Sequence, residues 1–538
     1  MSSQNYNELS FQDEKDTTDN VTENHPKKSS SYNFQEKRVD YLSIRNIGLF
    51  FLYFFIGICD VFTYRLTYEF FRLYLGLDGE LNNISEVIIS FPWAFKIFYG
   101  LINDCFPIKG YRRKPYMIMG WIGCTCVGTY ICLKDMPPSK YNHVVYSNGS
   151  VCYSTKTKNP DFTDEKYASI AMHYMLLLFL YQFFLVMSVV AMDGLMVKYA
   201  RGEDVKERGK AQTYIYACRT VGEIIGALVK AFSLNWYLYS GPWCFGLKVE
   251  HLFSIIAIAP ICAIPITIFM TTEDRVSAQA LNKASVTIFR AWKLLKSKVI
   301  QRVMLFSFMT VFLMGFISPA EIMIKDKWVH VSSLLNNASA LVCQMLFTAG
   351  TLIFSKYLLN FNWRITFAST AIFSILLNLI TTLIVVFDIV RNQYFYLSDD
   401  VVTSILQGMN FICSLLLIVE LSEPQLEGIL YSLISTSNNI ASYFSLLLSN
   451  VIVLPFHVSK DTRYDRDAPR DRQIIALQAC VLAAVQLLFV FFLPLLPKGK
   501  VETQKLKSSM GSSSNQRGAV VLSTLVIIFI FSIALSTT

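Results

Sequence analysis

Long apolar runs separated by short polar connections make up most of the chain after residue 42. A helix needs about 20 mostly apolar residues to cross the hydrocarbon core of a bilayer. Twelve segments reach roughly this length, at 46–72, 84–102, 115–133, 167–192, 211–233, 250–271, 302–321, 335–358, 363–387, 400–421, 428–455 and 473–496. The pattern therefore predicts an all-α polytopic membrane protein with twelve transmembrane helices.

Basic residues gather in alternate connections, at 37–45, 109–114, 198–210, 275–302 and 498–507. The intervening connections are mostly less basic, and in 463–472 aspartates largely balance the cations. Because Arg/Lys-rich loops stay in the cytoplasm, this alternation predicts that both ends of the twelve-helix region are cytoplasmic. No secretory signal peptide precedes the first helix, which we expect to act as the targeting signal, most simply for the plasma membrane.

Six helices, a basic connection and six more helices predict two bundles. The expected divisions are a disordered cytoplasmic tail at 1–42, an N-terminal bundle at 43–271, a cytoplasmic basic linker at 272–301, a C-terminal bundle at 302–497 and a tail at 498–538. The apolar run 519–535 superficially resembles a GPI-anchor signal. A cytoplasmic C-terminus contradicts that reading and favours an additional membrane helix.

Composition narrows the function. Apolar residues make up 53% of the chain and charged residues 16%, against roughly 25% charged residues in soluble domains. The net charge of +9 comes from short loops, so it does not indicate nucleic-acid binding. We find no zinc-site spacing, catalytic motif or ATP-binding loop, and therefore expect no cofactor, no enzyme and no ATP-driven pump.

The expected external loops contain two glycosylation sequons, at Asn83 and Asn148. Cys152 and Cys244 also fall in expected external loops. They either pair in an oxidising environment or remain free thiols. Most other cysteines lie inside apolar runs, where we expect them to be small hydrophobes rather than a disulfide framework.

The segment 92–116 carries the most informative charges. Lys96, Gly100 and Asp104 are spaced four residues apart and share one helix face. A lysine in an apolar helix costs about 2.5–3.5 kcal/mol on insertion scales, so it normally faces a protein interior or an aqueous cavity. A short basic loop follows at once, as expected of a cytoplasmic connection.

The string Gly100-x-x-x-Asp104 followed by Lys109-Gly110-x-Arg112-Arg113 resembles the signature loop of the major facilitator superfamily. In that superfamily the aspartate and arginines form a cytoplasmic gate between the bundles. The resemblance therefore implies gating roles for Gly100, Asp104, Gly110, Arg112 and Arg113. The alternative is that the cations only fix the topology, and the two roles are compatible.

A longer string resembles the hallmark of the folate–biopterin transporter family: Pro92-Trp93-x-x-Lys96, Tyr99-Gly100, Asp104, Pro107, Gly110 and Arg112-Arg113-x-Pro115-Tyr116. Further similar positions are Asp193-Gly194-Leu195, Ala200-Arg201, Gly209-x-x-Gln212, Arg219, Gly222, Glu427-Gly428 and Ser437-Asn438-Asn439. The resemblance covers about 46–496 and implies a major facilitator fold of two six-helix bundles. Ile97 and Asn103 depart from the expected proline and serine, which leaves the exact substrate open.

Arg219, Glu223, Gly226 and Lys230 form one stripe of a predicted helix. Arg219 lies nine residues beyond Lys210, which puts it about 13 Å into the membrane at 1.5 Å per residue. It either forms an internal pair with Glu223 or binds an anionic ligand, because a guanidinium engages carboxylates through two hydrogen bonds.

Asp60 and Asp193 are the other deep carboxylates, and in major facilitators the helices at these positions line the central cavity. Desolvation favours a protonated carboxyl, so Asp60, Asp193 and Glu223 are candidate proton carriers. The alternative is pairing of the two aspartates with Arg219 or Lys96.

We expect the membrane interior of the second half to carry neutral polar groups instead. They are Gln344, Asn378, Gln407, Asn410, Asn438 and Asn439. Such amides either hydrogen-bond to a heteroaromatic ring or bridge helices.

Together these features predict a secondary active transporter of folate- or pterin-type metabolites that works by alternating access, with proton symport as its candidate drive. The candidate substrate ligands are Lys96, Arg219, Asp60, Asp193, Asn410 and Asn438. The expected partners are a small anionic substrate and membrane lipid, without nucleic acid. Two alternatives remain: the same fold carrying another polar metabolite such as S-adenosylmethionine, and a non-transporting receptor or scaffold.

Overall fold

The computed structural model describes residues 43–537, apart from gaps at 64–65, 68–69, 72–73, 78–84, 86–87, 138, 140, 149–150, 159–163, 205–206, 235–242, 276–283, 319, 322–323, 332, 424–425, 457–466 and 509–513. All of them belong to one compact unit, Lys37–Thr538. The expected tail at 1–42 and the sequons at Asn83 and Asn148 lie wholly or partly outside the described residues.

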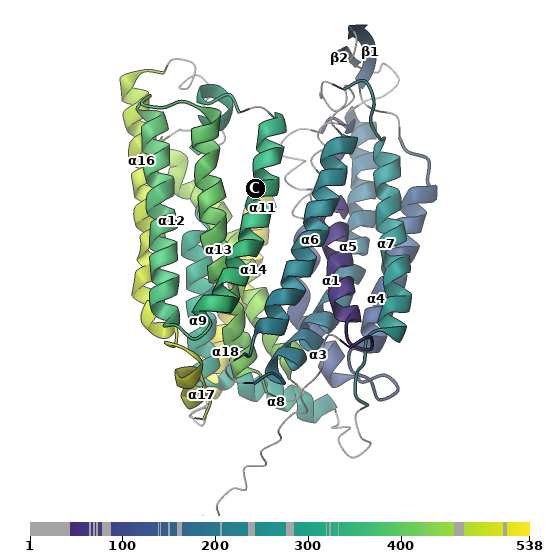
Figure 1. The fold of residues 1–538 in the computed structure, drawn as a ribbon, viewed down its shortest axis with the longest axis vertical. Coiled ribbons are helices and arrows are strands. Elements are labelled where there is room, and N and C mark those ends of the chain that lie inside the picture. The colour runs from purple at the N-terminus through teal and green to yellow at the C-terminus, as the bar shows by residue number, and fades with distance from the viewer. Residues whose placement is uncertain are drawn as a thin grey trace, which may run out of the picture. The chain divides into compact units, whose positions relative to one another are not determined.

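The first half is helical apart from one antiparallel hairpin. Its elements are α1 (Gly48–Thr63), the 3-10 turn η2 (Phe91–Phe95), α3 (Lys96–Cys105), α4 (Lys114–Leu133), β1 (Tyr141–Asn148), β2 (Val151–Lys158), α5 (Asp164–Arg201), α6 (Lys210–Ser233) and α7 (Val249–Phe269). α1 packs against α6 and α7, and α4 packs against α5 and α7. These helices form one group in Figure 1.

The second half follows the short helix α8 (Ala284–Lys296). It contains α9 (Lys298–Met314), the π-helical turns η5 (Ile324–Trp328) and η6 (Phe354–Leu358), α11 (Ser333–Ile353), α12 (Trp363–Val386), α13 (Gln393–Leu421), α14 (Glu427–Val453), η7 (Leu454–Phe456), α16 (Pro469–Leu487), η8 (Leu488–Leu495), α17 (Lys500–Ser508) and α18 (Asn515–Thr537). α18 packs on α8 and α14. Among the described residues, seven helices are long and apolar enough to cross a membrane. The count of twelve stays a prediction.

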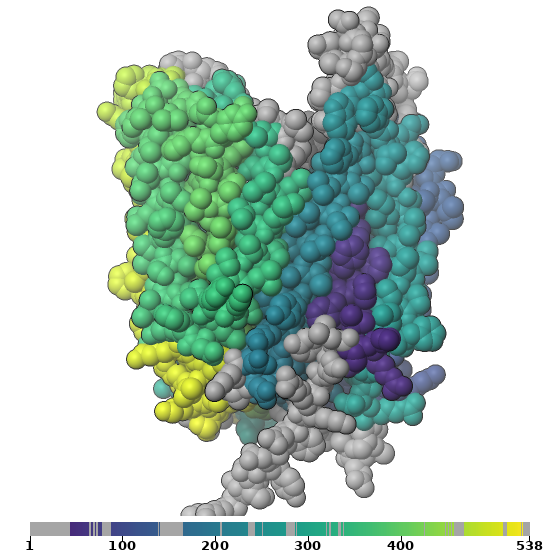
Figure 2. Space-filling model, viewed as in Figure 1, coloured from purple at the N-terminus to yellow at the C-terminus, as the bar shows by residue number. Residues whose placement is uncertain are grey.

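The two groups of helices meet where α3 and α5 contact α14 and where α6 contacts α11. We call the end that holds α8, α17 and the connection 109–114 the basic end, and the opposite end, which carries β1 and β2, the hairpin end (Figure 1). Figure 2 shows the groups in contact over their lower part, with a notch between them toward the hairpin end. The contacts between the halves are therefore concentrated toward the basic end on this face.

Glycines allow α1 and α6 to touch through their backbones. A Cβ on Gly57 would lie 2.1 Å from the carbonyl oxygen of Arg219, and a Cβ on Gly222 would lie 2.1 Å from that of Phe54. Larger side chains would force the helices apart, so this contact uses small residues, as membrane helices commonly do. It brings Asp60 on α1 within reach of Arg219 on α6.

Several cysteines inside the apolar runs are free thiols, as the sequence predicts. Cys59, Cys124 and Cys413 are buried free thiols. Cys244 is disulfide-bonded, whereas the side chain of Cys152 lies outside the described residues. Pairing between Cys152 and Cys244 therefore stays a prediction.

An ion-pair network at the hairpin end of the second half joins the connection between α12 and α13 to the start of α16. Asp467 accepts hydrogen bonds of 2.6 and 3.0 Å from Arg391 and of 2.8 and 2.7 Å from Arg472. The Arg391 guanidinium also lies 4.4 Å from the centroid of the Trp328 ring. Hydrogen bonds from Arg391, and then from Arg472, hold the pKa of Asp467 well below its usual value.

Replacing Asp467 by Asn should lower the Tm of the purified protein at pH 7, because both arginines then keep only Asp388 as a shared carboxylate. A lowered folded-state pKa stabilises the protein fully above the ordinary Asp pKa of about 3.9, and this contribution is lost as the pH falls through the folded-state value. The Tm difference should therefore shrink in acid. Glu165→Gln, which removes an exposed acid at the same end, is the control. Equal Tm values for wild type and Asp467→Asn at pH 7 would contradict this role.

Candidate functional site

A buried ion pair joins α3 to α5 in the middle of the first half. Lys96 places its Nζ 3.2 Å from Oδ2 of Asp193, with 5% and 2% of the two side chains exposed. The Tyr53 hydroxyl on α1 donates to Oδ1 of Asp193 over 2.5 Å. A buried charge is stable only when it is paired and hydrogen-bonded. Lys96 and Asp193 thus neutralise each other here, which is the pairing alternative of the sequence analysis.

Arg219 lies on α6 between two carboxylates. Its Nη2 is 2.5 Å from Oδ2 of Asp60, and its Nε is 3.2 Å from Oε1 of Glu223 one turn further along. The Arg219 side chain is 21% exposed, against 5% for Lys96, so Arg219 is the more accessible cation. The internal pair predicted for Arg219 is present, and Asp60 adds a second counter-ion.

This polar chain continues into the second half. Gln344 on α11 donates from Nε2 to Oε2 of Glu223 over 2.6 Å. A cavity of about 110 Å³ between α1, α6 and α11 is lined by Glu223, Gln344 and Lys230, among others. Because α6 runs toward the hairpin end, Lys230 and this cavity lie on the hairpin side of Arg219. Open space between the halves therefore borders the charged residues.

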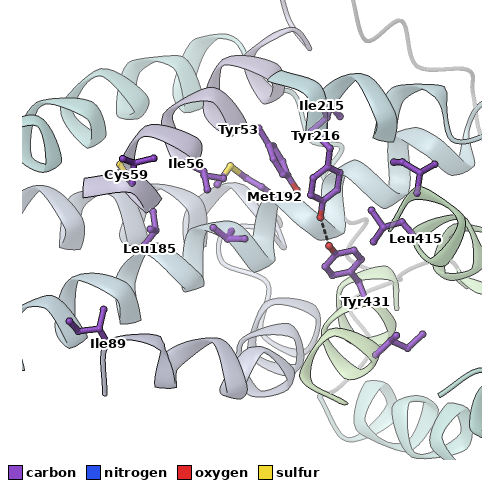
Figure 3. Close-up of a cluster of buried hydrophobic side chains, with 14 of the residues drawn as sticks. Tyr53, Ile56, Cys59, Ile89, Leu185, Met192, Ile215, Tyr216, Leu415 and Tyr431 are labelled. Atoms are coloured by element: carbon purple, nitrogen blue, oxygen red, sulfur yellow. Dashed lines mark hydrogen bonds between the residues drawn. The ribbon is translucent and has the colours of Figure 1, made fainter. Parts of the chain in front are cut away.

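Aromatic rings surround the two cations. Lys96 Nζ lies 4.7 Å from the ring centroid of Trp93 and 5.5 Å from that of Tyr431, and the Arg219 guanidinium lies 5.8 Å from Trp93. Figure 3 shows the hydroxyl groups of Tyr216 and Tyr431 hydrogen-bonded to each other, which joins α6 to α14. Trp93 is thus close to both ion-paired cations. We call Lys96, Asp193, Arg219, Asp60, Glu223 and Trp93 the central site.

The amides of the second half divide into two groups. Asn410 and Asn438 accept hydrogen bonds of 2.6 and 2.7 Å from hydroxyl groups on other helices of the same half. Asn439 instead donates to the backbone oxygen of Trp93 over 2.9 Å, and Gln344 contacts α6. The structure therefore brings Asn439 and Gln344 to the central site, and the ligand roles of Asn410 and Asn438 stay predictions.

The sequence analysis did not identify the three tyrosines of the central region. Tyr216 could have been found, because it precedes Arg219 by three residues and shares its helix face. Tyr53 and Tyr431 come from helices far apart in the chain, and no local pattern marks them.

Charged residues join the two halves at the basic end. Asp104 accepts a hydrogen bond of 3.0 Å from the backbone N–H of Ile429 on α14. Arg113 places its Nη2 2.7 Å from Oε2 of Glu427 and 3.8 Å from Oδ1 of Asp104. Arg201 binds the other oxygen of Glu427 at 3.1 Å. We call these contacts the gate, and they hold the halves together in this structure.

Backbone geometry supports the gate. The carboxylate of Glu273 accepts hydrogen bonds of 2.8–3.1 Å from the backbone N–H groups of 112–114. Gly110 has a φ of 83°, a left-handed conformation that favours glycine. A Cβ on Gly100 would lie 2.0 Å from Oγ of Ser432, so glycine is needed where α3 meets α14. The signature loop thus depends on both its charges and its glycines.

The expectation of a neutral interior in the second half is wrong at Asp399. α13 begins at Gln393 rather than near residue 400, so Asp399 lies inside a helix with only 6% of its surface exposed. Asn378 donates to its Oδ2 over 3.0 Å. The pair lines a cavity of about 160 Å³ together with Glu321, Lys325 and Asp400.

Comparison with known proteins places this geometry in a family. Residues 56–151 and 161–510 match the sequence profile of the BT1 family. A folate-biopterin transporter of Synechocystis sp. is 21% identical over 449 residues, which cover 81% of this chain and 78% of the relative. Folate transporter 1 of Plasmodium falciparum is 20% identical over 418 residues, which cover 77% and 72% of the two chains.

Solved structures identify the fold. A proton:xylose symporter of the major facilitator superfamily gives a TM-score of 0.52 at 12% identity, covering 86% of this chain and 97% of its own. The human organic anion transporter TETRAN gives 0.52 at 10% identity, covering 84% and 99%. The protein is therefore an all-α, multi-pass membrane protein with the major facilitator fold. Since the profile match spans most of its length, the chain belongs to the BT1 family.

Proposed function

We propose that this protein is a secondary active transporter of folate- or pterin-type metabolites that works by alternating access between its two halves. Relatives named for folate and biopterin transport support the cargo, and the symporter fold supports the mechanism. The central site carries the proposal, because it holds paired and partly accessible charges beside Trp93 where the two halves meet.

In this proposal, the closed gate and the cavity beside Glu223 correspond to an outward-facing conformation. The gate joins the halves at the basic end, whereas the cavity beside Glu223 lies toward the hairpin end. Because Arg/Lys-rich connections stay in the cytoplasm, we assign the basic end and the tail 1–42 to the cytoplasm of a plasma-membrane protein. The segments 43–271 and 302–497 would move as bundles around the linker 272–301, and the segment 519–535 in α18 would cross once more.

The chemistry of the central site suits a folate or pterin. A planar heteroaromatic ring can stack on Trp93 and hydrogen-bond to the Gln344 amide. A carboxylate on the cargo can engage Arg219 through two hydrogen bonds. Ring and acid would then occupy neighbouring parts of one site.

The charge balance suggests how a proton takes part. Arg219 already contacts Asp60 and Glu223, so an anionic cargo meets a neutralised cation. A proton on either carboxylate releases one side of the guanidinium, and the cargo carboxylate can replace it without leaving a buried charge unpaired. Proton and cargo would then bind together, as symport requires.

The same charge balance favours one alternative cargo. The central site holds three carboxylates and two cations, so it also suits a metabolite that carries its own positive charge, such as S-adenosylmethionine. A non-transporting receptor is the remaining alternative, and it would bind a ligand without moving it.

Proteoliposomes that contain the purified protein should accumulate radiolabelled folate or biopterin, and uptake should rise when a pH gradient drives protons in the same direction. Preferential uptake of S-adenosylmethionine would replace the folate assignment with the cationic cargo. Binding without accumulation of any of the three compounds would indicate a receptor.

Arg219→Lys should raise the KM for an anionic cargo about tenfold, because lysine keeps the charge but loses one charge-assisted hydrogen bond of the planar fork. The variant should still fold, since a cation remains beside Asp60. Arg290→Lys, an exposed replacement on α8, is the matched control. Wild-type KM in Arg219→Lys would show that Arg219 is only a structural counter-ion.

Glu223→Gln should mimic the protonated carboxyl and make uptake less dependent on pH, while Gln at this position can still hydrogen-bond to Gln344. Initial uptake rates from pH 5.5 to 7.5 measure this. An unchanged pH profile would remove Glu223 from the coupling step and leave Asp60 and Asp193 as the candidates.

Glu427→Gln should loosen the gate, because Arg113 and Arg201 then lose their shared counter-ion. Cys105, which is 4% exposed on α3 near the gate, should react faster with a membrane-permeant alkylating reagent. Cys59, buried between α1 and its neighbours, is the internal control and should stay protected. An unchanged Cys105 rate together with wild-type transport would contradict the gate assignment.

A further inference from the structure

A groove at the basic end of the second half is lined by lysines and exposed apolar side chains. It encloses about 560 Å³ between the turn 359–362, which connects η6 to α12, and the start of α17. Lys498, Lys500 and Lys505 line it together with Glu502. Glu502 already pairs with Arg364 at 3.3 Å. The groove is therefore strongly basic.

Two of the three lysines, Lys498 and Lys505, are available to an anion. Lys498 and Lys505 are exposed, and no carboxylate among the described residues pairs with either ammonium group. Lys500 is buried, and this burial lowers the pKa of its amine to about 8. A bound anion would stabilise the charged form of Lys500.

The groove lies beside the ends of three candidate membrane spans. The turn 359–362 separates two candidate membrane spans, Ala338–Leu358 and Trp363–Val386, and Lys498 follows the end of a third, Pro469–Leu495. Phe361 and Val501 are 64% and 66% exposed at the groove. Basic and exposed apolar side chains thus meet beside the ends of candidate membrane spans, as a lipid with an anionic headgroup and acyl chains would require.

We propose that this groove binds the phosphate-bearing headgroup of an anionic phospholipid. Basic pockets beside the ends of membrane helices suit such headgroups. The exposed Phe361 and Val501 favour a lipid over a free phosphate ion, because an acyl chain covers apolar surface that a free ion leaves in water.

The helix α17, which borders the groove, also contacts both halves of the protein. Lys500 donates from Nζ to the backbone oxygen of Arg208 in the first half over 3.1 Å. Gln504 and Lys507 donate to Glu420 at the end of α13 over 3.3 and 3.2 Å, and Arg208 pairs with Glu420 at 2.9 Å. A headgroup that holds α17 in place therefore favours the conformation with the basic end closed.

Thermal unfolding in nanodiscs tests the proposal with the full-length protein. Adding a phosphatidylinositol phosphate to phosphatidylcholine should raise the Tm of wild type. The double variant Lys498→Gln/Lys505→Gln should bind this lipid about thirtyfold more weakly, since each lysine near a membrane surface contributes about fivefold. Its Tm in phosphatidylcholine alone should match wild type, because both side chains are exposed.

The double variant Arg290→Gln/Lys293→Gln is the matched control. It removes two exposed cations from α8 at the same end and should keep the full response to the lipid. An equal lipid response in the groove variant would overturn the proposal. An equal Tm rise from inorganic phosphate without the lipid would also overturn it, because the site would then bind the ion alone.

Discussion

Every charged side chain buried in a membrane interior needs a partner of opposite charge. This constraint shapes both the central site and the gate. Lys96 reaches 5% exposure only because Asp193 neutralises it. In the central site Lys96 and Asp193, and likewise Arg219 and Asp60, come from separate helices, so these two ion pairs also fix helix positions. Removing one partner of a buried pair leaves the other charge uncompensated, at a cost of about 3–5 kcal/mol. The charges therefore act as structural joints as well as candidate ligands, and in the proposed function cargo would bind by exchanging partners.

The central site and the gate are connected because the same helices carry both. The residues concerned are Lys96 and Asp104 on α3, Asp193 and Arg201 on α5, and Tyr431 and Glu427 on α14. At 1.5 Å per residue, each pair spans no more than about 12 Å along its helix. A shift of α14 that breaks Glu427 from its arginines therefore also moves Tyr431 relative to Lys96. Helices are stiff over two turns, so a change in one site is transmitted to the other without an additional element.

Sequence patterns located the charged residues but not most of their partners. Lys96, Asp104 and Arg219 could be identified because a charge inside an apolar run is conspicuous and costly. The hydrogen bonds from Tyr53 to Asp193, from Gln344 to Glu223 and from Ile429 to Asp104 could not, since these depend on which helices become neighbours. Asp399 was missed because helix ends are the least certain part of a sequence-based assignment. Conversely, Asn410 and Asn438 were expected to bind the substrate because they are polar residues inside apolar helices. In the structure their hydrogen bonds stay within one half.

Alternating access also requires that the gate can open, and an ionic gate is suited to this. When the halves separate, water hydrates Asp104, Arg113 and Glu427, which offsets much of the attraction lost between them. An apolar contact of the same area would gain no such compensation and would favour the closed state strongly. Reversing a 99:1 preference requires about 5.5 kcal/mol of differential binding. In the proposed function, a bidentate contact with Arg219 and burial of a heteroaromatic ring against Trp93, both made in only one of the two conformations, would be of that order. The cargo alone could then shift the balance between the two conformations.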